Sequence, residues 1–229
     1  LIVTASKLEL ESFFKYPYNY HKDVPQLLGF PRYDALEKKE DYMEIVIMPS
    51  WRRHFLHSTK EKILKSNYFM IYNSLINDSR LIDFCKKHGY KLIFKPHPNV
   101  YRFIELFETN DYVIIDSTSN SYNDIFTHAS LIITDYSSIA FDFAYLKKPV
   151  IYYHYAKDYH FDLEESYFDY KTMGFGEVIK KEDDLIKLIK DYLDNDCKMK
   201  EVYKKRVDEF YKYNDQNNSK RVYNWIYEN

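Results

Sequence analysis

The sequence predicts an α/β protein built on a parallel sheet with helices on both faces. Short apolar runs rich in Ile, Val and Tyr alternate along the chain with stretches of helical periodicity. Strands that are covered by helices on both faces have near-continuous apolar runs of this kind. Strands that alternate with helices are typical of βαβ units, in which each helix connects two parallel strands.

The strand predictions rest on these apolar runs and on the residues that bound them. Pro49-Ser50-Trp51 follows the second run, and Pro96-His97-Pro98 breaks the chain after the third. In chain order, the predicted strands are Leu1–Ala5, Ile45–Met48, Lys91–Lys95, Tyr112–Ile115, Leu131–Thr134 and Pro149–His154.

Caps and apolar faces at helical spacing predict the helices. Asn77 and Asp78 are suitable caps for a helix over Ser79–His88, and Gly89 is a stop signal after it. Further predicted helices cover Asn99–Phe107, Tyr122–His128, Ser137–Leu146, Met199–Tyr211 and Ser219–Tyr227. Another helix is predicted by the apolar residues between Leu185 and Leu193, which fall on one helical face.

The chain has 229 residues, which fits one large domain or two small ones. The charged stretch Leu36–Asp41 is the weakest point of continuity. The residues before it carry one strand-like and one helix-like run, which is too little for a domain. We therefore predict a boundary that separates residues 1–40 from a main domain over residues 41–229.

The composition excludes several classes of protein. The chain is 45% hydrophobic and 30% charged, which excludes a disordered protein. No apolar run approaches the roughly 20 residues of a membrane-spanning helix. The formal charge of −2 argues against a general nucleic-acid binder. Only two cysteines occur and no signal-peptide pattern is present, so we expect a reducing, cytoplasmic setting.

Glycine is scarce. The chain has four glycines, whereas an average usage of about 7% predicts roughly 16. The glycine-rich fingerprints of dinucleotide-binding domains, P-loop NTPases and protein kinases are absent. A bound phosphate must therefore be held by side chains and helix N-termini.

Two polar motifs follow predicted strands, namely Lys95–Asn99 (KPHPN) and Thr134–Ser138 (TDYSS). In open parallel sheets, ligands bind beyond the carboxyl ends of the strands. Ser137 or Ser138 can cap the helix that follows, and a helix N-terminus suits a phosphate. His97 lies between two prolines and is a rigidly placed donor to a phosphate oxygen.

Simpler explanations stand beside these interpretations. Asp142 lies one helical turn after Ser138 and suits the hydroxyls of a sugar or ribose, but a solvated helix residue explains it as well. The serines by themselves are explained by a helix cap. His54 and His57 are three positions apart, yet no third ligand has a suggestive spacing, so we expect no metal and no cofactor.

Four blocks of the sequence resemble one enzyme family. They are Leu28–Leu36 (LGFPRYDAL), Met48–Arg52 (MPSWR), Lys95–Asn99, and Leu131–Tyr153 (LIITDYSSIAFDFAYLKKPVIYY). Their order and spacing resemble those of the CDP-glycerol glycerophosphotransferases, which comprise teichoic-acid polymerases and primases and related capsule enzymes. The resemblance implies a GT-B fold with two Rossmann-like halves. It implies that residues 1–40 are the tail of the acceptor-side half with its linker, and that residues 41–229 bind the nucleotide donor.

The resemblance also implies a reaction, in which an acceptor hydroxyl attacks the β-phosphate of CDP-glycerol and CMP leaves. His97 resembles the family's essential phosphate-contacting histidine, and Ser137 and Ser138 resemble its donor-phosphate hydroxyls. The other expected site residues are Arg32 and Arg52 for phosphate, Asn123, Asp124 and Asp142 for the nucleotide or ribose, and Asp135 as a structural orienter of the turn. For both arginines a surface ion pair is an equal alternative.

The chain departs from the family in two respects. The family's second histidine lies in a His-Gly-Thr type motif, and no such motif occurs here. We therefore expect this chain to bind a donor without turning it over by itself. The residues after Arg52 lack the acidic residue that is common in the family, which leaves the type of donor open.

The sequence thus predicts a transferase that moves glycerol phosphate, or a related polyol phosphate, from a CDP-linked donor to a cell-wall or capsular polymer or its lipid-linked precursor. The alternatives are a GT-B glycosyltransferase that uses a UDP- or CMP-sugar, and a non-catalytic nucleotide- or phosphopolymer-binding module. We expect the protein at the inner face of the cell membrane, with no nucleic-acid partner. The basic run from Lys198 to Arg206 suits anionic lipid, although a solvated helix explains it better.

Overall fold

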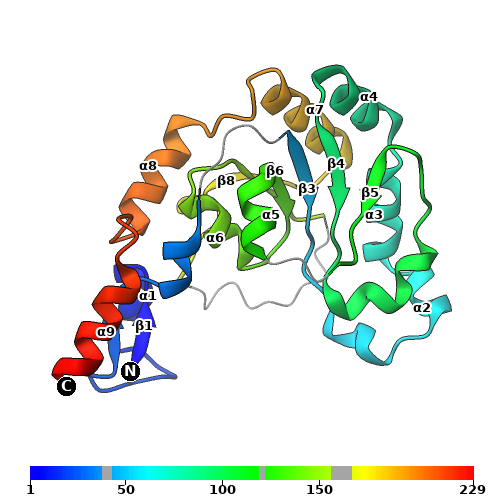
Figure 1. Cartoon of the computed structure of the whole chain (residues 1–229). Helices are drawn as coiled ribbons and strands as arrows, with labels where there is room; N and C mark the ends of the chain where they lie inside the picture. The colour runs from blue at the N-terminus through cyan, green and yellow to red at the C-terminus, as the bar shows by residue number, and fades with distance from the viewer. Residues whose placement is uncertain (38–42, 119–121, 156–166) are drawn as a thin grey trace.

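The computed structural model describes residues 1–37, 43–118, 122–155 and 167–229 (Figure 1). A six-stranded parallel sheet has the order β5-β4-β3-β6-β7-β8. The chain builds outward from β3 in one direction and then from β6 in the other, which is the doubly wound α/β arrangement. The predicted fold class is confirmed. The strands are β3 (Glu44–Ile47), β4 (Lys91–Phe94), β5 (Val113–Ile115), β6 (Ala129–Thr134), β7 (Val150–Tyr153) and β8 (Gly176–Ile179).

Successive side chains along β3 enter two separate apolar cores, because neighbouring residues of a strand point to opposite faces. Ile45 and Ile47 lie in one core, while Val46 and the following Met48 lie in the other. The sheet is therefore covered on both faces. The helices of the first core are α3 (Asn67–Ile76), α4 (Ser79–His88) and α7 (Glu182–Leu193); those of the second are α5 (Tyr122–His128), α6 (Ile139–Tyr145) and α8 (Glu201–Phe210).

Helix α4 has the bounds that its sequence predicts. The Asp78 carboxylate accepts hydrogen bonds from the backbone N–H groups of Arg80 (2.8 Å) and Leu81 (3.3 Å). Gly89 ends the helix with φ of 74°, a left-handed conformation that glycine adopts at no steric cost.

The residues before β3 form a small unit beside the main sheet. The parallel strands β1 (Ile2–Thr4) and β2 (Pro25–Leu27) are joined through α1 (Lys7–Ser12), and the 3₁₀ helix η1 (Pro31–Ala35) follows. The last helix, α9 (Asn218–Glu228), packs against η1, so the two ends of the chain lie together (Figure 1). The predicted boundary after residue 40 stays a prediction, and residues 38–41 of the predicted linker lie outside the described ranges.

Some elements differ from the prediction. The stretch after His97 is a 3₁₀ helix, η3 (Pro98–Leu106), rather than an α-helix. Strands β2 and β8 and helix α3 were not predicted; β8 carries Gly176 and Glu177 in place of a continuous apolar run. Two short helices, η2 (Arg53–His57) and α2 (Lys60–Leu64), complete the described elements.

Helix α8 carries the basic run of the sequence. Its Val207 and Phe210 are buried in the second core. The lysines pair with nearby carboxylates, Lys200 with Glu177 (2.5 Å) and Lys204 with Glu201 (2.6 Å). These contacts favour a solvated helix packed on its own domain. In the described ranges, no helix has the length and apolar character needed to cross a bilayer.

Candidate functional site

The strand order of the main sheet reverses between β3 and β6, and the crevice at such a switch point is where ligands bind in doubly wound folds. The loops that leave these two strands are tied together. The backbone N–H of Ser50, after β3, donates a hydrogen bond to Oδ1 of Asp135, after β6 (2.9 Å). Asp135 is fully buried. This contact supports the orienting role expected of Asp135.

Arg52 lies in the same buried cluster. Its Nη1 is 2.9 Å from Asp135 Oδ2 and also donates to Ser50 Oγ (2.8 Å), while Nη2 donates to the hydroxyl of Tyr155 (3.0 Å). Both charged side chains of the ion pair are almost completely buried, at 2% and 0% exposed. In this structure Arg52 therefore braces the switch-point loops, and a contact to a donor phosphate would require the pair to open.

His154 lies behind these loops, at the end of β7. Its Nε2 is 3.2 Å from the carbonyl oxygen of Asp135, and its ring stacks on Tyr136 with 3.9 Å between the ring centroids. Burial lowers the pKa of His154 to about 4. The imidazole is therefore neutral at pH 7 and donates its Nε2–H to the carbonyl.

His97 begins η3, immediately beyond β4. Its Nδ1 accepts a hydrogen bond from the backbone N–H of Asn99 (3.2 Å), which places the proton of the neutral ring on Nε2. The ring stacks on Trp51, with 5.6 Å between the centroids and 24° between the planes. Burial lowers the pKa of His97 below its ordinary value. At pH 7 His97 is thus a neutral, oriented side chain with an Nε2–H donor.

The serines of TDYSS precede helix α6. Ser137 Oγ accepts a long hydrogen bond from the N–H of Ile139 (3.5 Å), and Ser138 occupies the cap position without a side-chain cap bond. Ser138 is exposed and Ser137 is half-buried. The Ser138 hydroxyl is thus not used to cap the helix.

Arg32 and Asp142 contact each other. Arg32 donates from Nε (3.1 Å) and Nη2 (2.8 Å) to the same oxygen of Asp142, Oδ1. The arginine side chain is 56% exposed. This ion pair joins η1 to α6. The sequence assigns Arg32 to a phosphate and Asp142 to the nucleotide or ribose. In the structure the two side chains bind each other, which is the surface ion pair expected as the alternative for Arg32.

The remaining predicted residues lie in the first turn of α5. Asn123 is half-buried and Asp124 is exposed. The Oδ1 atom of Asn123 is buried and accepts no hydrogen bond from the described residues. The nucleotide role of both residues stays a prediction.

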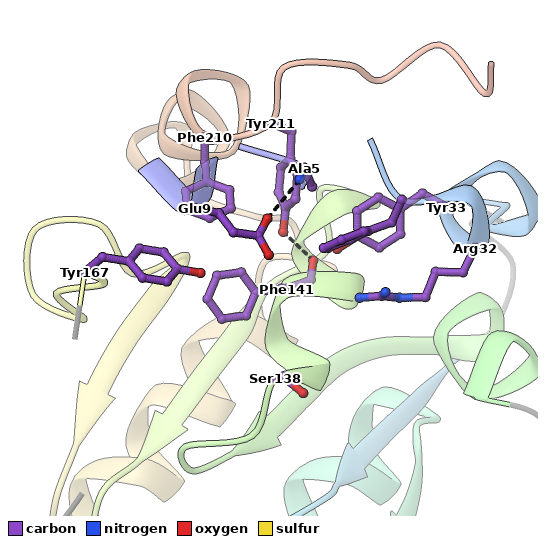
Figure 2. Close-up of a pocket in the computed structure, with 10 residues that line it drawn as sticks. Ala5, Glu9, Arg32, Tyr33, Ser138, Phe141, Tyr167, Phe210 and Tyr211 are labelled. Carbon is purple, nitrogen blue, oxygen red and sulfur yellow. Dashed lines mark hydrogen bonds between the residues drawn. The ribbon is translucent and has the colours of Figure 1, made fainter. Parts of the chain in front are cut away.

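A pocket of about 190 Å³ lies beside the serines, between α1, η1 and α6 (Figure 2). It brings the predicted residues Arg32 and Ser138 together with Glu9 and Tyr167, which the sequence does not single out. The Oε2 atom of Glu9 accepts a hydrogen bond from the backbone N–H of Ala5 (2.8 Å). Burial raises the pKa of Glu9 above its ordinary value.

Sequence reasoning missed Trp51, Glu9 and Tyr167. Trp51 lies inside the MPSWR block, directly after a predicted strand. Looking for an aromatic side chain that could stack on His97 would have identified it. Glu9 follows Ser6 in the S-x-x-E pattern of a capping box, and Ser6 Oγ does accept from Glu9 N–H (3.1 Å). That pattern predicts a helix start and gives no sign of a pocket.

The fold defines a GT-B-type half, namely a doubly wound α/β domain with polar side chains at its switch point. The chain matches the model of the CDP-glycerol:poly(glycerophosphate) glycerophosphotransferase family over residues 2–228. It belongs to this family, as its motifs indicate.

Relatives and solved structures agree with this assignment. The chain is 46% identical to the minor teichoic acid biosynthesis protein GgaB of Bacillus subtilis, over 100% of this chain and 26% of that protein. It is 28% identical to a teichoic acid poly(glycerol phosphate) polymerase of Bacillus spizizenii, over 70% of this chain and 43% of the relative. The wall teichoic acid polymerase TagF has the same fold, with a TM-score of 0.73 and 20% identity over 99% of this chain and 57% of TagF. The chain thus spans between about a quarter and just over half of these proteins.

Proposed function

We propose that this chain supplies the donor-binding part of a transferase that moves glycerol phosphate, or a related polyol phosphate, from a CDP-linked donor to a cell-wall or capsular polymer. The observation that carries the proposal is the geometry of His97. A neutral ring, oriented by Asn99 and Trp51, offers Nε2–H beyond the carboxyl end of β4. Membership of the family and the names of the relatives support the same substrate class.

In the proposed reaction, an acceptor hydroxyl attacks the β-phosphorus of the donor, and a new P–O bond forms as the P–O bond to CMP breaks. The hydroxyl proton passes to a base, and CMP carries the released charge away. His97 Nε2–H and the hydroxyls of Ser137 and Ser138 stabilise the phosphate oxygens on which charge develops. Asp135 and Arg52 hold the loops that carry these donors.

Calorimetric titration tests the proposal. We expect wild-type chain to bind CDP-glycerol or CDP-ribitol more tightly than CMP or UDP-N-acetylglucosamine. His97→Ala should weaken CDP-polyol binding by about 10- to 100-fold, because a hydrogen bond to a charged group contributes about 1.5–3 kcal/mol. His21→Ala is the control, since His21 is 70% exposed and pairs only with Asp23 among the described residues.

Two results would contradict the proposal. A preference for the UDP-sugar would favour the glycosyltransferase alternative, and equal CDP-polyol affinities of wild type and His97→Ala would remove His97 from the site.

We further propose that the acceptor is a polymer or lipid-linked precursor and that the protein acts on the cytoplasmic side of a membrane to which it attaches peripherally. The relatives' names place them in teichoic acid biosynthesis, which supports a polymer acceptor. Release of the protein from membranes by high salt, but not by buffer alone, would support the attachment.

A further inference from the structure

The pocket between α1, η1 and α6 has two kinds of wall. Aromatic rings form one side, including Phe141 and Tyr211, and the Tyr211 hydroxyl is already used in a hydrogen bond to the carbonyl oxygen of Phe141 (2.7 Å). Polar groups converge from the other sides. Figure 2 shows the Glu9 carboxylate, the Tyr167 hydroxyl and the Arg32 guanidinium directed toward the space around Phe141.

Charge is distributed unevenly along this pocket. Glu9 is the lining residue with a carboxylate. This carboxylate accepts backbone hydrogen bonds from Ala5 and Ser6, and Figure 2 shows it beside the pocket. A phosphate beside Glu9 would meet a like charge in a half-buried setting, which is unfavourable. Arg32 and the exposed hydroxyl of Ser138 lie at the other end. Arg32 already pairs with Asp142 (2.8 Å), so a phosphate there would share the guanidinium with that carboxylate and accept a hydrogen bond from Ser138.

The size of the pocket limits its occupant. At about 190 Å³ it is smaller than the roughly 300–1,000 Å³ of sites that enclose drug-sized ligands. This volume suits one small unit better than a whole nucleotide. Aromatic rings pack against the C–H faces of such a unit, while Glu9 accepts and Tyr167 donates hydrogen bonds to its hydroxyls.

We infer that this pocket binds the uncharged, hydroxyl-rich group of a phosphorylated polyol or sugar, with Glu9 and Tyr167 reading its hydroxyls and the phosphate lying toward Ser138 and Arg32. The inference rests on the proposed function, because it names the part of the substrate that a polyol-phosphate transferase must recognise. The hydroxyl-rich group belongs either to the donor, as the unit being transferred, or to the end of the acceptor.

The test compares Glu9→Gln and Tyr167→Phe with matched controls, Glu11→Gln on the same helix and Tyr16→Phe, a tyrosine that is 88% exposed. Calorimetry on the full 229-residue chain measures affinity for glycerol 3-phosphate, ribitol 5-phosphate, inorganic phosphate, CDP-glycerol and a short glycerol-phosphate oligomer. Thermal unfolding shows whether each variant is folded. Glu9 also belongs to the capping box of α1, so Glu9→Gln can unfold this helix. In that case the affinities of Tyr167→Phe test the inference.

We expect Glu9→Gln to weaken polyol-phosphate binding about tenfold and Tyr167→Phe about two- to tenfold, since one hydrogen bond is lost or made neutral in each. Inorganic phosphate should bind all variants within twofold of wild type, and both controls should bind every ligand as wild type does. A loss confined to CDP-glycerol assigns the pocket to the donor's transferred unit, and a loss confined to the oligomer assigns it to the acceptor.

Three results would overturn the inference: unchanged affinities in both variants, an equal loss for inorganic phosphate, or no binding of any polyol phosphate by wild type. Failure of the proposed function gives a different pattern, because it is read from the ligand preference of the wild-type chain and from His97→Ala, whereas the inference is read from the Glu9 and Tyr167 variants.

Discussion

At the scale of single residues, the two histidines beside the switch point have different surroundings and different uses. His97 is half-buried, with one nitrogen fixed by Asn99 and the other carrying the proton. His154 is 8% exposed and donates to the carbonyl oxygen of Asp135. In the proposed function the first contacts the ligand, whereas the second stabilises the loop that carries the serines.

The buried His154 predicts a loss of stability in mild acid. Its pKa is about 4 when folded against an ordinary value of 6.5, so the unfolded chain binds more protons between these values. The stabilisation is complete above pH 6.5 and is lost as the pH falls toward 4, with a decrease of about 2 kcal/mol in the free energy of unfolding between pH 7 and pH 5. Urea titrations at the two pH values measure it.

The matched variant His154→Gln should show a smaller decrease between these pH values, because its side chain does not titrate. His21→Gln, at an exposed position, should behave as wild type. Equal decreases in wild type and His154→Gln would show that other groups cause the acid sensitivity.

Single residues also show where sequence reasoning about the site ended. The positions of His97 and the two serines beyond β4 and β6 could be predicted, because their motifs directly follow the apolar runs that form these strands, while their roles in binding stay a prediction. The partners of Arg32 and Arg52 could not be predicted, since Asp142 and Asp135 are 110 and about 83 positions away and their approach depends on the whole fold. Glu9 and Tyr167 meet at the pocket for the same reason.

At the scale of elements, local signals decided what could be predicted. Helices α4 and α5 have the predicted bounds, because caps and apolar periodicity are properties of neighbouring residues. Strand β8 was not predicted, because Gly176 and Glu177 interrupt its apolar character. At Gly176 an added Cβ would lie 1.6 Å from the carbonyl oxygen of Val150 in β7. The close approach to β7 requires glycine there, and a sequence pattern cannot show which strand lies alongside.

The cap of α4 gives a prediction at this scale. Asp78→Ala removes the acceptor of two backbone N–H groups and should lower the free energy of unfolding by about 1 kcal/mol. Asp83→Ala, at an exposed position within the same helix, should change it by less than about 0.5 kcal/mol. Chemical denaturation of both variants measures the difference, and equal effects would mean that Asp78 acts only as a surface charge.

At the scale of the whole molecule, the last helix belongs with the first segment of the chain. The Asp34 carboxylate accepts hydrogen bonds from the backbone N–H groups of Asn218 (2.9 Å) and Ser219 (2.7 Å), so it caps α9 from a distant part of the sequence. Gly29 lies close to the same helix, where a Cβ would meet Asn218 Oδ1 at 1.9 Å. The PRYD motif thus contributes a structural clamp through its aspartate and a pocket residue through its arginine.

Loss of this clamp should release α9 alone. We expect Asp34→Ala to lower the local stability of residues 218–228 by about 0.5–2 kcal/mol, the range for loss of a helix cap, without affecting α4. Hydrogen exchange of the backbone amides separates the two helices. Asp23→Ala, at an exposed carboxylate of the same unit, is the control. Faster exchange throughout the protein would show instead that the clamp stabilises the whole fold.

The two arginine–aspartate pairs of the site differ in one physical respect, their contact with solvent. Arg32 at the mouth of the pocket is more than half exposed, whereas the pair of Arg52 and Asp135 is buried. Dissolved ions screen the attraction between Arg32 and Asp142, because the Debye length is about 8 Å at physiological ionic strength. They have little effect on the buried pair of Arg52 and Asp135. Rising ionic strength should therefore weaken the pair of Arg32 and Asp142 while the buried pair at the switch-point loops is little affected. Under the proposed function, salt concentration would then change the affinity of the pocket for a polyol phosphate without disturbing the loops that carry the serines.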